Sequence, residues 1–77
     1  MDDKRALLIG GGGTLGEYAA LELLKAGWSV DVLAPEELTS WNRRLRYFRG
    51  RADDATLREL FGANRYAVVV DYLHFRD

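Results

Sequence analysis

The sequence predicts an α/β fold with a parallel sheet, and three observations carry this prediction. Short apolar runs alternate with segments of helical composition. The first run, residues 6–9, is continuously apolar, which is typical of a strand buried on both faces of a parallel sheet. Glycines end this run, and a helix-forming segment follows at once. Strands that alternate with helices imply parallel pairing with right-handed crossovers.

The first predicted helix spans residues 14–26. It is rich in residues that favour helices, and Gly27 follows where a left-handed C-terminal cap is common. A second strand is expected over residues 28–33. The apolar side chains that recur at helical spacing in the first helix are Leu15, Tyr18, Ala19, Leu23 and Ala26.

The stretch after the second strand predicts a short helix. Pro35 fits its first position, and Glu36 and Glu37 would complement its dipole. Ser40 and Asn42 limit its length.

The remaining chain predicts a strand, a helix and a strand. The third strand is expected over residues 45–49, and the fourth is centred on residues 67–70. Asp53 or Asp54 caps the intervening helix, which ends at Gly62. The apolar side chains on one face of this helix are Leu57, Leu60 and Phe61.

The predicted order is therefore β-α-β-(α)-β-α-β, half of a doubly wound three-layer fold. Such a half has sheet order 3-2-1-4, and its ligand crevice lies outside the carboxyl ends of strands one and four. A chain of 77 residues is enough for one small domain.

The glycine run carries the motif G-x-G-x-x-G at Gly11, Gly13 and Gly16. We expect Gly11 to permit the tight turn with a positive φ, and Gly16 to let the helix pack closely on the sheet. Gly13 lacks a side chain, so a pyrophosphate can approach the backbone. Backbone N–H groups at the helix start, at Thr14 and Leu15, would face this anion. A β-α-β unit of about 30 residues is the context in which this motif marks a Rossmann dinucleotide-binding fold.

Charged residues near the end of the second strand bear on the cofactor. The carboxylate that binds the adenosine ribose is expected about 20 residues beyond the glycines, where Glu36 is nearest. The alternative for Glu36 is a solvated carboxylate in a first helical turn. Arg43 and Arg44 would instead meet a 2′-phosphate, or form solvated surface, so the cofactor is NAD or NADP. Asp31 is expected to point sideways within its strand.

The glycine turn and its flanks resemble the extended short-chain dehydrogenase/reductase family, the NAD-dependent epimerases and dehydratases. Residues 9–16 match its G-G-T-G-x-x-G turn, with Gly12 in place of the usual threonine. The similarity continues through residues 48–50, 54–60 and 68–71. It implies that residues 1–77 are the N-terminal half of an NAD(P)-binding domain, in an oxidoreductase acting on a nucleotide sugar or similar substrate.

Two places depart from the family pattern. After the third strand the family has Gly-Asp, whose aspartate contacts adenine, but here Gly50 is followed by Arg51. The resemblance then implies that the adenine contact is made by the Ala52 backbone or by Asp53, or that it is altered. After the fourth strand, bulky residues 72–75 replace a pair of small ones near the nicotinamide ribose.

No catalytic residue is predicted. The family uses Tyr-x-x-x-Lys, and none of the four tyrosines is followed by lysine at that spacing. The chain alone is expected to bind a dinucleotide weakly and to catalyse nothing. The alternatives are a non-enzymatic dinucleotide-sensing or regulatory module, and a site for a flavin dinucleotide or S-adenosylmethionine.

Composition narrows the remaining function classes. The formal charge of −1 argues against nucleic acid, and no cysteine is present for a thiolate or metal site. The lone His74 is expected to be a partly exposed residue at a strand end. The apolar runs are too short for a signal peptide or a membrane span, so we expect a cytoplasmic protein.

The fourth strand is expected to form an exposed sheet edge. If the chain ends at residue 77, the backbone of residues 67–70 is left unpaired on one side. Natural proteins avoid such edges because they pair with other chains. We therefore expect self-association, pairing with another segment, or a missing C-terminal half.

Overall fold

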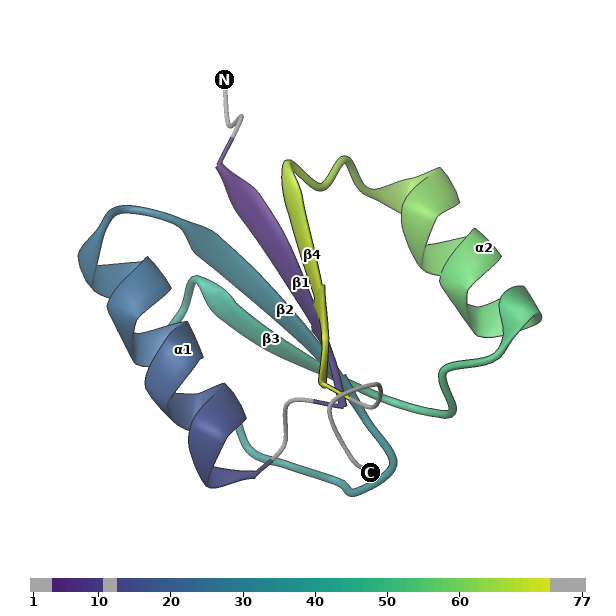
Figure 1. Cartoon of the computed structure of the whole chain (residues 1–77), viewed down its shortest axis with the longest axis horizontal. Coiled ribbons are helices and arrows are strands. Elements are labelled where there is room, and N and C mark those ends of the chain that lie inside the picture. The colour runs from purple at the N-terminus through teal and green to yellow at the C-terminus, as the bar shows by residue number, and fades with distance from the viewer. Residues whose placement is uncertain (1–3, 11–12, 73–77) are drawn as a thin grey trace.

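The computed structural model describes residues 4–10 and 13–72. Four strands and two helices follow one another as β1 (Arg5–Ile9), α1 (Thr14–Lys25), β2 (Ser29–Ala34), β3 (Leu45–Arg49), α2 (Asp54–Ala63) and β4 (Val68–Asp71). All pairings are parallel and the sheet order is β3-β2-β1-β4. The two helices lie on opposite sides of the sheet (Figure 1). The predicted three-layer α/β half fold with order 3-2-1-4 is confirmed.

The core consists of two apolar layers, one on each face of the sheet. The α1 face buries Leu8, Ala20, Leu24, Val30, Val32, Ala34 and Leu45. The α2 face buries Leu7, Ile9, Leu33 and Leu60. β2 is buried along its whole length and β1 along nearly all of it, as expected of central strands in a parallel sheet. Neither described helix is long and apolar enough to cross a bilayer.

Helix α1 ends in the predicted glycine cap. Gly27 has a φ of +93°, and its N–H donates to the Leu24 carbonyl at 3.1 Å. The Trp28 N–H donates to the Leu23 carbonyl at 2.9 Å, which completes a Schellman motif. The buried stripe of α1 is Gly16, Ala20 and Leu24. Leu15 and Tyr18, which were part of the expected apolar set, are exposed instead.

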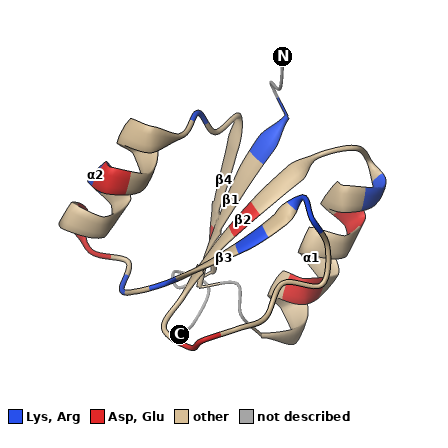
Figure 2. Ribbon diagram, turned by 180° about the vertical axis from the view of Figure 1, so that it is seen from behind, with Lys and Arg blue, Asp and Glu red and all other residues tan. Residues whose placement is uncertain are grey.

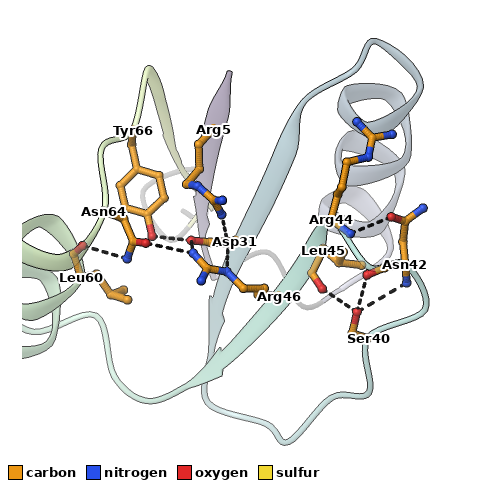
Figure 3. Close-up of polar contacts among 10 residues, drawn as sticks. All are labelled: Arg5, Asp31, Ser40, Asn42, Arg44, Leu45, Arg46, Leu60, Asn64 and Tyr66. Atoms are coloured by element: carbon orange, nitrogen blue, oxygen red, sulfur yellow. Dashed lines mark hydrogen bonds and ion pairs between the residues drawn. The ribbon is translucent and has the colours of Figure 1, made fainter. Parts of the chain in front are cut away.

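The short helix expected after Pro35 does not form. Residues 35–44 contain no helix or strand. Ser40 Oγ donates to the carbonyl oxygens of Asn42 and Leu45, and Asn42 Oδ1 accepts from the Arg44 N–H at 2.9 Å (Figure 3). These side chains bond to the local backbone and so compete with the helical pattern.

Helix α2 runs slightly further than predicted. It continues past Gly62 to Ala63, with Asn64 as its C-cap. Both the backbone N–H and the side-chain amide of Asn64 donate to the Leu60 carbonyl, at 3.0 and 3.2 Å. The Leu60 carbonyl near the end of α2 is thus hydrogen-bonded without a glycine in the left-handed conformation. Gly62 is therefore an ordinary helical residue and does not end the helix.

The carboxylate of Asp31 is the centre of a buried polar cluster (Figure 3). Asp31 is fully buried and shares the sheet face of Leu33 and α2, so the expectation that it points sideways was wrong. Arg46 donates from Nε to Oδ1 at 2.8 Å and from Nη2 to Oδ2 at 2.7 Å. Arg5 donates to Oδ1 at 3.1 Å, and the Tyr66 hydroxyl donates to Oδ2 at 2.6 Å.

Two donors of the Asp31 cluster, Arg46 and Tyr66, keep their protons at neutral pH. The hydrogen bond to Asp31 raises the pKa of Arg46. Burial raises the pKa of Tyr66 far above its usual range, and the hydrogen bond to Asp31 adds to this. Among the described residues no buried side-chain nitrogen or oxygen lacks a partner. The cluster therefore links three strands at neutral pH without an unpaired buried charge.

We expect Asp31→Ala to lower the free energy of unfolding by about 3 kcal/mol, because two arginines would lose their shared counter-ion. Tyr66→Phe removes one hydrogen bond and should cost about 1 kcal/mol. Urea denaturation followed by circular dichroism measures both losses. The control is Glu22→Ala, which breaks an exposed pair with Lys25 and should change stability by less than about 0.5 kcal/mol. A loss for Asp31→Ala no larger than that of the control would contradict the role of the cluster.

Candidate functional site

The candidate site lies at the edge of the sheet where the parallel strands end. Gly10, directly after β1, has a φ of +74°, and Gly11, where the sequence predicts the tight turn with a positive φ, lies outside the described residues. The Gly10 N–H donates to the Leu33 carbonyl at 2.7 Å, so the turn out of β1 is tied to the end of β2. The turn out of β1 thus starts at Gly10, and the role of Gly11 stays a prediction.

The N-terminus of α1 is open to a ligand at Gly13. This residue is the N-cap, and no side chain caps the helix. A Cβ built at Gly13 would meet no atom within 4 Å. The first intrahelical bond runs from the Glu17 N–H to the Gly13 carbonyl at 2.9 Å, so the N–H groups before Glu17 have no partner within the helix.

The three other predicted turn residues follow Gly13 directly. Thr14 and Leu15 form the exposed start of α1, and the Leu15 side chain is 71% exposed. Gly16 is buried against the sheet, as expected of a residue that allows close packing. This end of the helix can accept an anion through its backbone.

A small cavity lies beside the glycine turn at the same edge. Its volume is about 190 Å³, and its lining residues are Gly10, Leu33, Pro35, Gly50, Arg51 and Ala52. These residues come from the ends of β1, β2 and β3. The Gly50 N–H donates to the Ala34 carbonyl at 2.9 Å, and this hydrogen bond keeps the ends of β2 and β3 in register. An apolar slot of this kind suits one face of a flat heteroaromatic ring.

Acidic and basic residues both occur in the loops that follow β2 and β3 (Figure 2). Glu36 follows β2 and is exposed at the cavity edge. Its neighbour Glu37 forms an exposed ion pair with Arg49, with Oε1 and Nη1 3.6 Å apart. Glu36 therefore lies at the edge of the sheet where the strands end, and its contact with a ribose stays a prediction.

Arg44 does not lie at this edge, so the expectation that it meets a 2′-phosphate was wrong. Its guanidinium donates to the Leu24 and Trp28 carbonyls at 2.9 and 3.1 Å. These carbonyls lie in and just after the last turn of α1, at the edge of the sheet where β2 begins. The physical reason is the negative end of the helix dipole, which attracts a cation there.

Asp53 has a structural role that bears on its predicted adenine contact. Its carboxylate accepts from the Thr56 N–H at 2.9 Å and caps α2, as predicted. This backbone hydrogen bond is the largest of the interactions that lower the pKa of Asp53. Contact with adenine stays a prediction.

Sequence reasoning gave too little weight to the residues that line the cavity. Pro35 and Arg51 follow strand ends and Leu33 lies near the end of β2, so the rule that ligands bind outside the carboxyl ends of strands points to all three. His74 lies outside the described residues. Within the described ranges no three His, Cys, Asp or Glu side chains gather as metal ligands.

A wider groove of about 500 Å³ runs along the outer side of α1. It is lined by Thr14, Glu17, Tyr18, Leu21 and Trp41. Trp41 in this groove is 48% exposed. The groove meets the candidate site only at Thr14.

The lowered pKa of Asp53 gives a pH-dependent prediction. A carboxylate whose pKa is lower in the folded state stabilises the fold above its unfolded pKa, near 3.8, and loses this effect as the pH falls through its folded value. We expect Asp53→Ala to lower the melting temperature at pH 7 and to differ much less from the wild type in acid. Asp54→Ala, in the first turn of α2, is the matched control. An equal difference at pH 7 and pH 3 would contradict the capping role.

Comparison with known proteins places the fold. No protein-family model matches the sequence, and no match to a curated protein was found. A solved structure, a short-chain dehydrogenase from Leptospira borgpetersenii serovar Hardjo-bovis (strain JB197) with bound NAD+, superposes with a TM-score of 0.67 and 23% sequence identity. The match covers 82% of this chain and 26% of the dehydrogenase, so the chain corresponds to about a quarter of that protein. The chain thus has an α/β Rossmann-like half fold similar to part of a short-chain dehydrogenase.

Proposed function

We propose that the chain binds NAD(H), as the cofactor-binding portion of an NAD-dependent epimerase/dehydratase-like oxidoreductase. The observation that carries the proposal is the open Gly13 at the N-terminus of α1, at the same edge of the sheet as the apolar cavity. A pyrophosphate would lie against the backbone N–H groups of Thr14 and Leu15. The adenine would enter the cavity, with Ala52 at its lining and Asp53 next to it.

Glu36 is the proposed ligand of the adenosine ribose. It stands at the end of β2, where a carboxylate can accept hydrogen bonds from the two ribose hydroxyls. Glu37 lies beside it, and two carboxylates there would repel a 2′-phosphate. Since Arg44 caps α1 at the opposite edge, NAD is proposed in preference to NADP. The similar dehydrogenase was solved with NAD+, which agrees with this choice.

Fluorescence titration with NADH tests the proposed binding. We expect Gly13→Val to weaken NADH binding at least tenfold, because the branched side chain would occupy the space of the pyrophosphate. Gly62→Val is the matched control, since a Cβ at Gly62 also meets no atom within 4 Å but lies in α2. Equal affinity of both variants and the wild type would contradict the site. Absence of NADH binding to the wild type at millimolar concentration would overturn the function.

A non-enzymatic dinucleotide sensor is the second candidate. The observation that favours it is that no tyrosine among the 77 residues is followed by lysine in the pattern Tyr-x-x-x-Lys. DNA sequencing beyond codon 77 distinguishes the two. An open frame that encodes the catalytic pair supports the oxidoreductase, and a stop codon supports the sensor.

We also propose that β4 pairs with a further strand, from a second copy or from the remainder of a longer protein. Val68 and Val69 are 38% and 44% exposed on opposite faces of this edge strand. Light scattering coupled to size exclusion should therefore show self-association of the isolated chain. Val69→Lys should reduce it, because charge on an edge strand opposes pairing. A stable wild-type monomer would contradict this proposal.

A further inference from the structure

The groove on the outer side of α1 gathers exposed apolar side chains. Tyr18 is 65% exposed, and Leu21 and Trp41, which line the same groove, are exposed as well. Thr14 and Glu17 complete the lining, so polar groups stand beside the apolar ones. In soluble proteins, a group of exposed apolar side chains rimmed by polar residues marks a surface that associates with a partner.

The groove lies at the opposite end of the sheet from β4. Trp41 belongs to the loop that leads into β3, and β3 and β4 are the two edge strands. A strand that pairs with β4 would be added at the far edge of the sheet from this loop. Such a strand would therefore leave the groove uncovered, and the partner of the groove has to be a different surface.

Two opposite charges flank the exposed apolar stripe of α1 at equal spacing. Glu17 lies four residues before Leu21 in the first turn, and Lys25 lies four residues after it in the last turn. Side chains four residues apart share one side of a helix, so all three lie along one stripe. Lys25 is also 3.6 Å from Glu22 in an exposed ion pair, and exposed pairs of this kind are weak.

A twofold axis at Leu21 would make this stripe complementary to itself. In two antiparallel α1 helices that cross at Leu21, position 17 of each copy lies opposite position 25 of the other. Each Glu17 would then face Lys25 of the second copy, and the two Leu21 side chains would pack together. A parallel pair would place like charges opposite one another, so the charges favour the antiparallel arrangement.

We propose that two copies of this chain associate through α1, antiparallel about a twofold axis at Leu21. Lys25 of the second copy would lie across the groove, with its apolar stem against the exposed rings and its ammonium group near Glu17. A twofold contact uses the same surface on both copies, so this contact closes as a dimer. The inference is independent of the proposed function, because the groove meets the candidate cofactor site only at Thr14.

Two charge-reversal variants test the antiparallel arrangement, each in a chain that also carries Val69→Lys to oppose association through β4. Glu17→Lys places lysine opposite lysine, and Lys25→Glu places glutamate opposite glutamate. Each alone should dimerise about tenfold more weakly than the Val69→Lys parent, as measured by sedimentation equilibrium. In a one-to-one mixture, opposite charges face one another at both contacts, so the mixture should regain dimers with the affinity of the parent. Glu59→Lys, the same reversal at an exposed residue of α2, is the matched control and should dimerise like the parent.

Crosslinking tests the position of the twofold axis in the otherwise wild-type chain, which contains no cysteine. Leu21→Cys would bring two thiols together at the axis. Under mild oxidation it should form a disulfide between copies about tenfold faster than Arg58→Cys. Arg58 is exposed in α2, and α1 and α2 lie on opposite sides of the sheet (Figure 1). Circular dichroism checks that every variant is folded.

Each outcome supports or overturns the dimer. A Val69→Lys parent that is monomeric at about millimolar concentration overturns the second copy as the partner of the groove. Charge-reversal variants that dimerise as well as the parent, or a mixture that regains no dimer, overturn the antiparallel contact. Disulfide formation by Leu21→Cys that is no faster than by Arg58→Cys overturns it as well, and this measurement decides alone if Val69→Lys fails to fold. Rescue in the mixture together with selective crosslinking supports the proposal.

Discussion

The fold is organised around the buried carboxylate of Asp31. Its two oxygens accept hydrogen bonds from Arg5 in β1, Arg46 in β3 and Tyr66 before β4. A shift of one residue in the pairing of β1 or β3 with β2 would turn Arg5 or Arg46 to the other face of the sheet, because side chains alternate along a strand. Burial of a charge is costly, but here donors from three directions compensate it. The cluster therefore specifies the register of the sheet more than it adds to stability.

That register determines what the opposite edge of the sheet can bind. Because the strands are parallel, the residues that follow β1, β2 and β3 meet there and enclose the cavity. The hydrogen bonds from Gly10 to Leu33 and from Gly50 to Ala34 extend the same alignment one residue beyond the strands. The helix dipole of α1 then favours an anion next to an apolar slot. A helix N-terminus next to an apolar cavity suits a ligand that carries both a phosphate and a flat ring.

Arg44 and Asp53 lie at opposite ends of the strands, and each lies beside the end of a helix. Arg44 binds carbonyls at the C-terminal end of α1, while Asp53 binds an N–H at the N-terminal end of α2. Each charge complements a helix end.

The sequence by itself determined the four strands, the two helices α1 and α2, the sheet order and the turn that follows β1. Apolar runs and the caps at Gly27 and Asp53 are local signals, which act through neighbouring residues. The tertiary structure decided the rest. The short helix after Pro35 was lost to side-chain bonds from Ser40 and Asn42, and the buried face of α1 was set by contact with the sheet. The Asp31 cluster and the cavity at Arg51 unite residues distant in sequence, and only packing brings such residues together.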